Sequence, residues 1–156
     1  MAFMDNELDR YKPASGQFEY RNFPFYWISR VWSAYSLRME RHLKRAKLNT
    51  TTWRIIMILN ERGCLSVSEL ATHAVAKTPT ITKAIYKMQD EGIVEIFPSK
   101  TDGRVSMVLL TPKGRKILEE IIHDTQKVFH DAYADLSHDE IDNLNLIMKK
   151  LFANLD

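Results

Sequence analysis

Apolar residues near both ends of the chain recur at the spacing of an α-helix. From Pro24 to Leu48 they return every three or four residues, which is one stripe of an amphipathic helix. The members of this stripe are Phe25, Ile28, Trp32, Tyr35, Met39 and Leu43. A second stripe, expected from Thr111 to Leu136, comprises Ile117, Ile121, Thr125, Val128 and Ala132. The pattern predicts long helices near both ends.

Shorter elements lie between these helices. Thr50 or Thr51 is expected to cap a helix that ends at Gly63, with Trp53, Ile56 and Leu59 or Asn60 along its apolar stripe. The sequence Ser66-x-x-Glu69 is a capping box and predicts a short helix over residues 67–73. A further capping box, Ser137-x-x-Glu140, opens the last helix, which carries Ile141, Leu144, Met148, Leu151 and Leu155.

A helix-turn-helix is predicted in the middle of the chain. Thr78 is expected to cap a helix with Pro79 in its first turn, and the helix runs to Glu91 before Gly92 ends it. This helix and the short helix before it are joined by a short link, as in helix-turn-helix proteins. The second helix is therefore a candidate for reading DNA.

The pattern then changes from helical to extended. Residues 93–97 and 104–110 are rich in β-branched side chains, and Asp102-Gly103 between them is a turn signal. This segment predicts a hairpin, or wing. We therefore expect a mainly α protein with a small β-hairpin wing, a winged helix-turn-helix with long N- and C-terminal dimerisation helices. The helices at both ends need a partner, and a second copy of the chain in a two-fold homodimer is the economical one.

The expected organisation is one compact domain in four parts. These are an N-terminal arm (1–21), a dimerisation and effector helix (22–48), the winged helix-turn-helix (49–111) and C-terminal dimerisation helices (112–156). The 156 residues, 45% apolar and 27% charged, suit one globular domain. No apolar run approaches the ~20 residues of a membrane span, and Met1–Arg10 lacks a signal-peptide layout, so a cytoplasmic protein is expected. Cys64, the single cysteine, is interpreted as a packed residue rather than a redox sensor.

Charge is distributed unevenly, which matters more than the net charge of +2. Between Lys77 and Lys87 there are three lysines and no acid, and Ile81, Ile85 and Met88 fall on the opposite face. This polar face is either a solvated helix surface or a DNA-reading surface, and the neighbouring wing favours DNA. The candidate DNA contacts are Lys77, Thr78, Thr80, Thr82, Lys83, Lys87, Lys100 and Arg104, with Asp102 supporting Arg104 in the wing.

Aromatic residues are concentrated between Phe18 and Tyr35, more than one helix stripe can bury. They either line a pocket for an effector with a flat or greasy body and an anionic group, or form a dimer core. For the first interpretation the candidate residues are Trp27, Arg30, Tyr35, Arg38, His42 and Trp53, and the effector is an anionic aromatic compound or an acyl thioester.

Catalytic and metal-binding signals are missing from the sequence. Glu120-x-x-His123 resembles half of a two-metal helix motif, but no converging ligands can be identified. There is no His-Glu-x-x-His, Gly-x-Ser-x-Gly or phosphate-binding glycine loop. We therefore expect neither an enzyme, nor a metal site, nor a cofactor.

From about Phe23 to Leu155 the chain resembles the MarR (multiple antibiotic resistance regulator) family of transcription factors. The segments that carry the resemblance are Leu70-Ala71, Thr80-Ile81-Thr82-Lys83, Glu91-Gly92-Ile93-Val94, Asp102-Gly103-Arg104 and Leu109-Leu110-Thr111-Pro112-Lys113-Gly114. The resemblance implies an obligate homodimer that places recognition helices in successive major grooves and wings at the flanking minor grooves. It also implies a repressor that a small ligand releases from an inverted-repeat operator.

The sequence departs from the family pattern at two places. Family members often have a basic residue after the Gly-x-Val segment, where this chain has Glu95 and Ile96. Lys83 stands where arginine is common in the family. Lysine binds as a point charge and reads guanine less well than the arginine fork.

The alternative function is a winged-helix protein-interaction module without sequence-specific DNA binding. Salt distinguishes the two, because counterion release makes DNA binding steeply salt-dependent.

Overall fold

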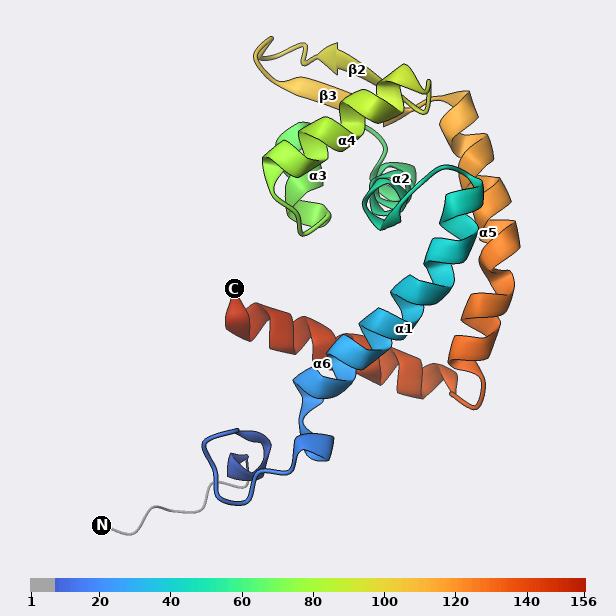
Figure 1. Cartoon of the computed structure of the whole chain (residues 1–156). Helices are drawn as coiled ribbons and strands as arrows, with labels where there is room; N and C mark the ends of the chain where they lie inside the picture. Colours follow the sequence, from blue (N-terminus) through green and yellow to red (C-terminus); the bar gives the residue numbers. More distant parts are fainter. Residues whose placement is uncertain (1–7) are drawn as a thin grey trace. The chain divides into compact units, whose positions relative to one another are not determined.

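The computed structural model describes residues 8–156, which are mainly helical with a small antiparallel sheet (Figure 1). The mainly α winged helix-turn-helix that the sequence predicts is confirmed. In chain order the elements are η1 (Asp9–Tyr11), η2 (Tyr20–Asn22), α1 (Pro24–Arg45), α2 (Thr50–Arg62), β1 (Leu65–Ser66), α3 (Val67–His73), α4 (Thr78–Asp90), β2 (Val94–Pro98), β3 (Ser106–Leu110), α5 (Pro112–Tyr133) and α6 (His138–Leu155).

The chain divides into two compact units, one reaching as far as Asp124 and the other comprising Thr125–Asp156. The first seven residues of the predicted N-terminal arm lie outside the described residues. Within the described part of the chain, none of the helices combines the length and apolar character that a membrane span requires.

Both predicted capping boxes are present. The Glu69 N–H donates to Ser66 Oγ at 3.2 Å, and a Glu69 carboxylate oxygen accepts from the Ser66 backbone N–H at 2.7 Å. Ser137 and Glu140 make the same pair of bonds at the start of α6. Hydrogen bonds from the Ser66 hydroxyl and backbone lower the pKa of Glu69, and those from the Ser137 backbone and hydroxyl lower the pKa of Glu140.

Two other helix starts differ from the prediction. Asn49, not Thr50 or Thr51, caps α2: its side chain accepts from the Thr52 N–H at 3.0 Å, and Thr52 Oγ1 accepts from the Asn49 N–H at 2.9 Å. Asn is a strong N-cap residue, and Thr52 completes the box in the place that Glu usually takes. Thr78 is not a cap but the first residue of α4.

Three helices end in the same arrangement of backbone bonds. At the end of α3, the N–H groups of Val75 and Ala76 donate to carbonyls three and five residues earlier, at 3.1 Å each. This is a Schellman motif, and it requires a left-handed residue at its turn. Val75 takes that conformation with φ 49°, as do Lys47 after α1 (φ 58°) and Gly92 after α4 (φ 71°). Only Gly92 does so without a side chain that opposes it.

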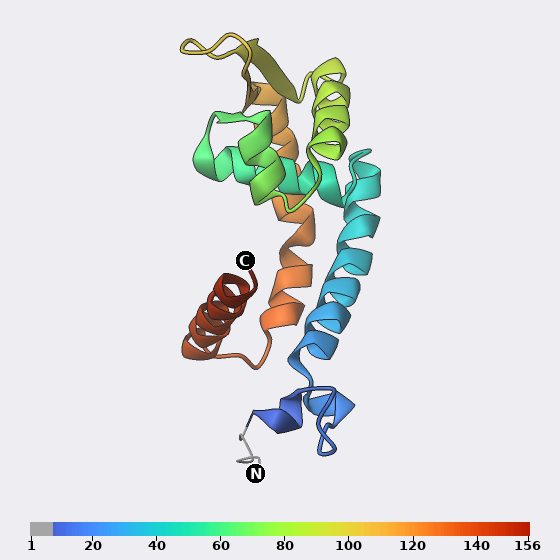
Figure 2. The same ribbon diagram turned by 90° about the vertical axis from the view of Figure 1, so that its left-hand side faces the viewer.

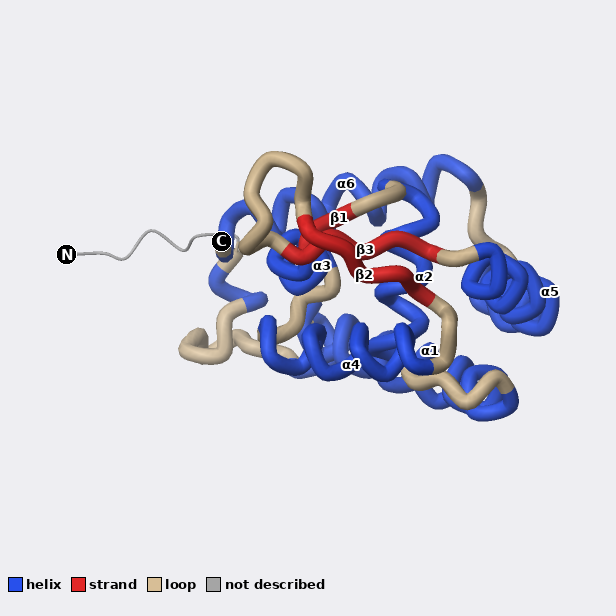
Figure 3. The backbone as a smooth tube through the Cα atoms, turned by 90° about the horizontal axis from the view of Figure 1, so that it is seen from above, coloured by secondary structure: helices blue, strands red, loops and turns tan. Residues whose placement is uncertain are grey.

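The wing belongs to a three-stranded antiparallel sheet in the order β1-β3-β2 (Figure 3). The β-branched runs of the sequence indicate the hairpin, whereas a two-residue strand such as β1 carries no alternating pattern of its own. Val94, Val108 and Leu110 are buried on one side of the sheet. β2 is as long as predicted but β3 is shorter, so the connecting loop over residues 99–105 is one residue longer and projects from the helices (Figure 2).

The core of the first unit is formed by the apolar stripes of its helices. Its fully buried large side chains include Met39, Leu43, Ile55, Ile56, Leu59, Leu70, Ile81, Ile85, Met88 and Val108. Leu59 rather than Asn60 completes the α2 stripe, and Leu118 rather than Ile117 is buried on α5. Ala132, placed on the α5 stripe by the sequence, is exposed, and so is Cys64, which the sequence suggested was packed. The first half of the α1 stripe also stays exposed, with Phe25 at 42% and Trp32 at 47%.

The end of α4 and the start of α5 are bound together. Thr111 Oγ1 donates to the Gly92 carbonyl at 2.7 Å and accepts from the Gly114 N–H at 3.1 Å. Lys113 Nζ donates to the Glu91 carbonyl at 2.6 Å. The carbonyls of Glu91 and Gly92, just beyond the end of α4, are thereby hydrogen-bonded by residues at the start of α5. We call this contact the α4–α5 joint.

Gly114 is essential to the geometry of this joint. A Cβ placed on Gly114 collides with the backbone carbonyl oxygen of Ile93 and lies 3.0 Å from a methyl group of Leu110. We expect Gly114→Ala to lower the free energy of unfolding by about 1–3 kcal/mol, because the backbone must shift to admit the methyl group. Urea unfolding monitored by circular dichroism measures the change.

Gly16→Ala is the matched control, since a Cβ there meets no described atom within 4 Å. It should change the free energy of unfolding by less than ~0.5 kcal/mol. Equal stability of the two variants would contradict the close approach at Gly114.

Candidate nucleic-acid interface

Helix α4 has one buried face and one exposed face. Ile81, Ile85 and Met88 are at most 1% exposed. Lys83 projects from the opposite side of the helix, and Tyr86 is 55% exposed. The division into a packed face and a polar face therefore agrees with the helical spacing.

Cationic side chains cover this exposed surface and continue into the wing. Lys77, Lys83, Lys100 and Arg104 are exposed, and none of these four forms an ion pair within residues 8–156. Lys87 is different, because its Nζ lies 3.8 Å from the Glu91 carboxylate. Four of the five predicted cations are thus available to phosphate, and the fifth is partly neutralised.

The N-terminus of α4 has no side-chain cap. Lys77 occupies the N-cap position without a side-chain hydrogen bond, and Pro79 lies within the first turn. The positive end of the helix dipole at this start attracts anions such as phosphate, although the Thr80 N–H is already bonded to the Lys77 carbonyl at 2.9 Å. Thr78 and Thr80 are exposed there, whereas Thr82 is half-buried and its hydroxyl donates to the Thr78 carbonyl at 2.9 Å.

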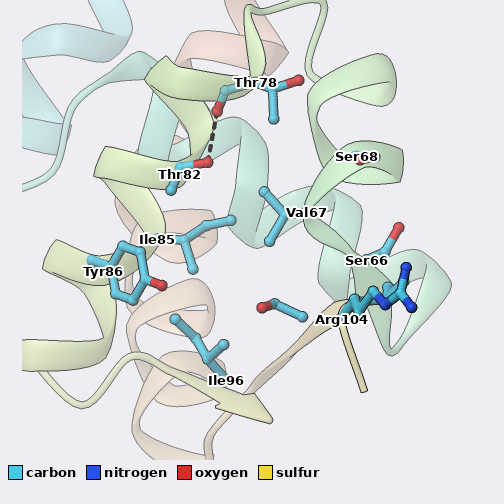
Figure 4. Close-up of a pocket in the computed structure, with 11 residues that line it drawn as sticks. Ser66, Val67, Ser68, Thr78, Thr82, Ile85, Tyr86, Ile96 and Arg104 are labelled. Carbon is cyan, nitrogen blue, oxygen red and sulfur yellow. Dashed lines mark hydrogen bonds between the residues drawn. The ribbon is translucent and has the colours of Figure 1, made fainter. Parts of the chain in front are cut away.

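A cleft of about 260 Å³ lies between α3, α4 and the wing. Figure 4 shows Arg104 beside Ser66 at one side of it, and Tyr86 and Ile85 from α4 at another. Arg104 is the one charged residue in its lining, which also includes hydroxyl groups of Ser68, Thr78, Thr82 and Ser106. The sequence does not single out Ser68 or Ser106, since surface serines carry no distinctive pattern.

The wing loop is held by backbone bonds around Asp102. The Asp102 side chain accepts from the Arg104 backbone N–H at 3.0 Å, and its carbonyl accepts from the Val105 N–H at 2.9 Å. Gly103 within this turn does not have a positive φ. Asp102 therefore fixes the backbone at Arg104, a residue of the cleft lining.

Five of the six predicted effector residues lie on α1, spread along the helix, and do not converge at one point. Trp27 Nε1 donates to the Arg21 carbonyl at 2.7 Å, and Arg30 is stacked over the Tyr26 ring at 5.5 Å. Fifteen helical residues separate Trp27 from His42, a distance of about 22 Å at 1.5 Å per residue. A small ligand therefore contacts only part of this set.

The part of α1 nearest to α2 has unsatisfied polar groups. Ser36 Oγ and His42 Nδ1 are buried and have no hydrogen-bond partner among the described residues. Tyr35 and Trp32 lie on the same side of the helix, with ring centroids 5.7 Å apart. Arg38, from the predicted set, is exposed. Such unpaired buried atoms are costly unless a ligand or water reaches them.

Two residues of α2 depart from the sequence-based interpretation. Trp53, expected beside the effector, belongs to the core with 5% exposure. Its neighbour Arg54, which the sequence does not single out, contacts α1 and the end of α3 at once: its guanidinium stacks on Trp32 and donates to the Ala74 carbonyl. An isolated arginine in a helix gives no signal for such a role.

The helix order, the cationic α4 and the adjoining wing define a winged helix-turn-helix protein. The family model described as the MarR family matches residues 48–106. The transcriptional repressor IacR of Pseudomonas putida is 41% identical over 144 residues, which cover 92% of this chain and 86% of that protein. The chain belongs to the MarR family.

Solved structures share this fold. A mutant MarR of Escherichia coli in complex with operator DNA superposes with a TM-score of 0.70 and 21% identity, over 80% of this chain and 89% of that one. Bordetella bronchiseptica BpsR, whose DNA binding is regulated by 6-hydroxynicotinic acid, gives a TM-score of 0.75 and 16% identity, over 87% and 97%. Membership in this family makes the protein a DNA-binding transcriptional regulator and not an enzyme.

Proposed function

We propose that the protein is a homodimeric repressor that binds an inverted-repeat operator in the cytoplasm and is released by a small anionic effector. The observation that carries the DNA-binding part is the exposed group of Lys77, Lys83, Lys100 and Arg104 around the uncapped start of α4. In this proposal α4 enters the major groove and the wing tip reaches the minor groove, where negative potential is focused. Thr80, Thr82 and Lys87 complete the contacts on α4, and Asp102 supports the wing.

Homodimer formation is supported by the exposed apolar side chains of the terminal helices. Helix α6 has 18 residues and none is buried, although Leu144, Leu146, Ile147 and Phe152 are large and apolar. A helix held only by its capping box is marginal in water, because packing of an apolar face supplies most helical stability. A second copy supplies that cover and brings two copies of α4 into one molecule. Half-sites about 34 Å apart then fall in successive major grooves.

The effector is proposed to bind along α1. The unpaired Ser36 Oγ and His42 Nδ1, the half-exposed aromatic rings and the cations Arg30 and Arg38 suit an anionic aromatic compound or an acyl thioester. The ligand that regulates BpsR is itself an aromatic acid. Release requires only that the effector bind more tightly to a conformation in which the two copies of α4 miss their grooves.

DNA binding is tested by titrating the protein with genomic fragments from beside its own gene at several salt concentrations. We expect tight, selective binding that weakens steeply with salt. Lys83→Ala should reduce the slope of log K against log salt by about 1, because one phosphate contact is lost. Arg104→Ala should weaken binding as well.

Lys44→Ala is the control, since Lys44 lies on α1 and pairs with Glu40 at 2.9 Å. It should leave the salt slope unchanged. A folded protein that binds no fragment at low salt would support the protein-interaction module instead.

The dimer is tested on α6. Leu144→Asp should convert the protein to a monomer in sedimentation velocity, because a charge is costly to bury in an apolar interface. Operator affinity should fall with it, since one half-site alone is then bound. Asn143→Asp adds the same charge at a neighbouring polar position and should remain dimeric. A dimeric Leu144→Asp protein with full affinity would argue against an interface at this face.

The effector is tested with a panel of aromatic acids and acyl thioesters. A true effector should lower operator affinity and raise the free energy of unfolding by about 2.7 kcal/mol at a concentration 100 times its Kd. Arg38→Gln should weaken both effects, whereas Arg62→Gln on α2 should not. If no compound changes either operator affinity or melting temperature, this class of effector is excluded.

A further inference from the structure

Arg54 connects three elements of the first unit. It lies on α2, and its Cζ is 5.2 Å from the centroid of the Trp32 ring on α1. Its Nη1 donates to the carbonyl of Ala74, twenty residues further along the chain. Arginine is suited to both contacts at once, because its planar guanidinium stacks on rings while its N–H groups donate in the plane.

The Ala74 carbonyl is a sensitive point in the helix-turn-helix. Ala74 is the C-cap of α3, and the last carbonyls of a helix have no partner within it. The chain leaves α3 through Val75, a β-branched residue in the left-handed region with φ 49° and 79% exposure. Such a residue opposes this conformation and gains no burial from it. The two backbone bonds of the Schellman motif hold this turn, and the Arg54 hydrogen bond to the Ala74 carbonyl adds a contact from outside it.

The start of α4 follows this turn directly. Thr78 begins the helix three residues after Val75, and the N-cap Lys77 adds no side-chain bond that fixes it. The other end of α4 is different: Gly92 adopts its left-handed turn without strain, and Lys113 satisfies the Glu91 carbonyl. The position of the N-terminal half of α4 thus relies on Arg54 more than that of the C-terminal half.

We infer that Arg54 is a positioning residue that sets the start of α4 through the Ala74 carbonyl, and that the Trp32 ring on α1 holds its guanidinium there. This inference rests on the proposed reading of DNA by α4. Because Trp32 is 47% exposed, a molecule that covers its ring or binds the guanidinium acts on the helix-turn-helix through a single side chain.

The test compares operator DNA with an unrelated duplex of equal length. Arg54→Met removes the hydrogen bond and should lower operator affinity about 10- to 100-fold, the effect expected for losing a bond from a charged donor. Arg54→Lys keeps the charge without the planar guanidinium, and its operator affinity should lie between that of Arg54→Met and that of the wild-type protein. Affinity for the unrelated duplex, which reads only charge, should change less than 2-fold in Arg54→Lys. Arg62→Met removes the same charge from an exposed site on α2 and is the matched control.

A double-mutant cycle tests the link to α1. Trp32→Leu, at a partly exposed position, should lower operator affinity about 2- to 5-fold by loosening Arg54. The loss should be absent when Arg54 is already methionine, because the two residues then no longer act together. Amide NMR signals of Val75, Ala76 and Thr78 should move in both single variants, and the Gly92 signal should not.

Several outcomes overturn the inference. Equal losses on operator and unrelated duplex in Arg54→Lys would show a general structural role, and additive losses with Trp32→Leu would remove the link to α1. If Arg54→Met does not fold, Arg54→Lys and Trp32→Leu still decide the question. If the wild-type protein binds its operator selectively and the Arg54 variants bind it with the same affinity, only the positioning role of Arg54 is contradicted. If the wild-type protein binds no duplex selectively, the proposed function itself is contradicted.

Discussion

The α4–α5 joint is the contact on which the geometry of the first unit depends. The carbonyls at the end of α4 have no partner within the helix, and leaving them unpaired in a part-buried site is costly. Thr111 and Lys113 satisfy them, while Gly114 allows the backbones to approach. One turn thereby fixes the end of α4, the start of β2 and the start of α5. Two motifs of the family resemblance, Glu91-Gly92-Ile93-Val94 and the one that ends at Gly114, meet here, and their role is structural.

The two ends of α4 are held by different means. The C-terminal end is bound within a relaxed turn, whereas the N-terminal end follows a strained residue, and the turn before it receives a hydrogen bond from Arg54 of α2. The end that lies nearest to the wing cleft and carries Lys77 is therefore the adjustable one. A ligand-responsive regulator needs both properties: a rigid scaffold that holds the DNA-contacting helix, and one element whose position a small free energy can change.

Much of the fold follows from local signals. Both Ser-x-x-Glu boxes, the buried face of α4 and the wing were predictable because caps, helical spacing and β-branched runs act over a few residues. The cap at Asn49, the two-residue β1 and the burial of Leu118 depend on tertiary neighbours. For the candidate site, the cations of α4 and the wing could be named from charge pattern. Arg54 and the serines of the cleft could not, since their partners lie far along the chain.

The small sheet also governs which surfaces of the protein can associate. An exposed sheet edge offers unpaired N–H and C=O groups to any passing strand and favours aggregation. Here one edge strand, β1, has two residues, and the other, β2, ends at Pro98, which has no N–H to donate. Neither edge can be extended far by a second chain. The protein can thus expose large apolar helix faces while its sheet does not pair with the sheets of other copies to form fibres.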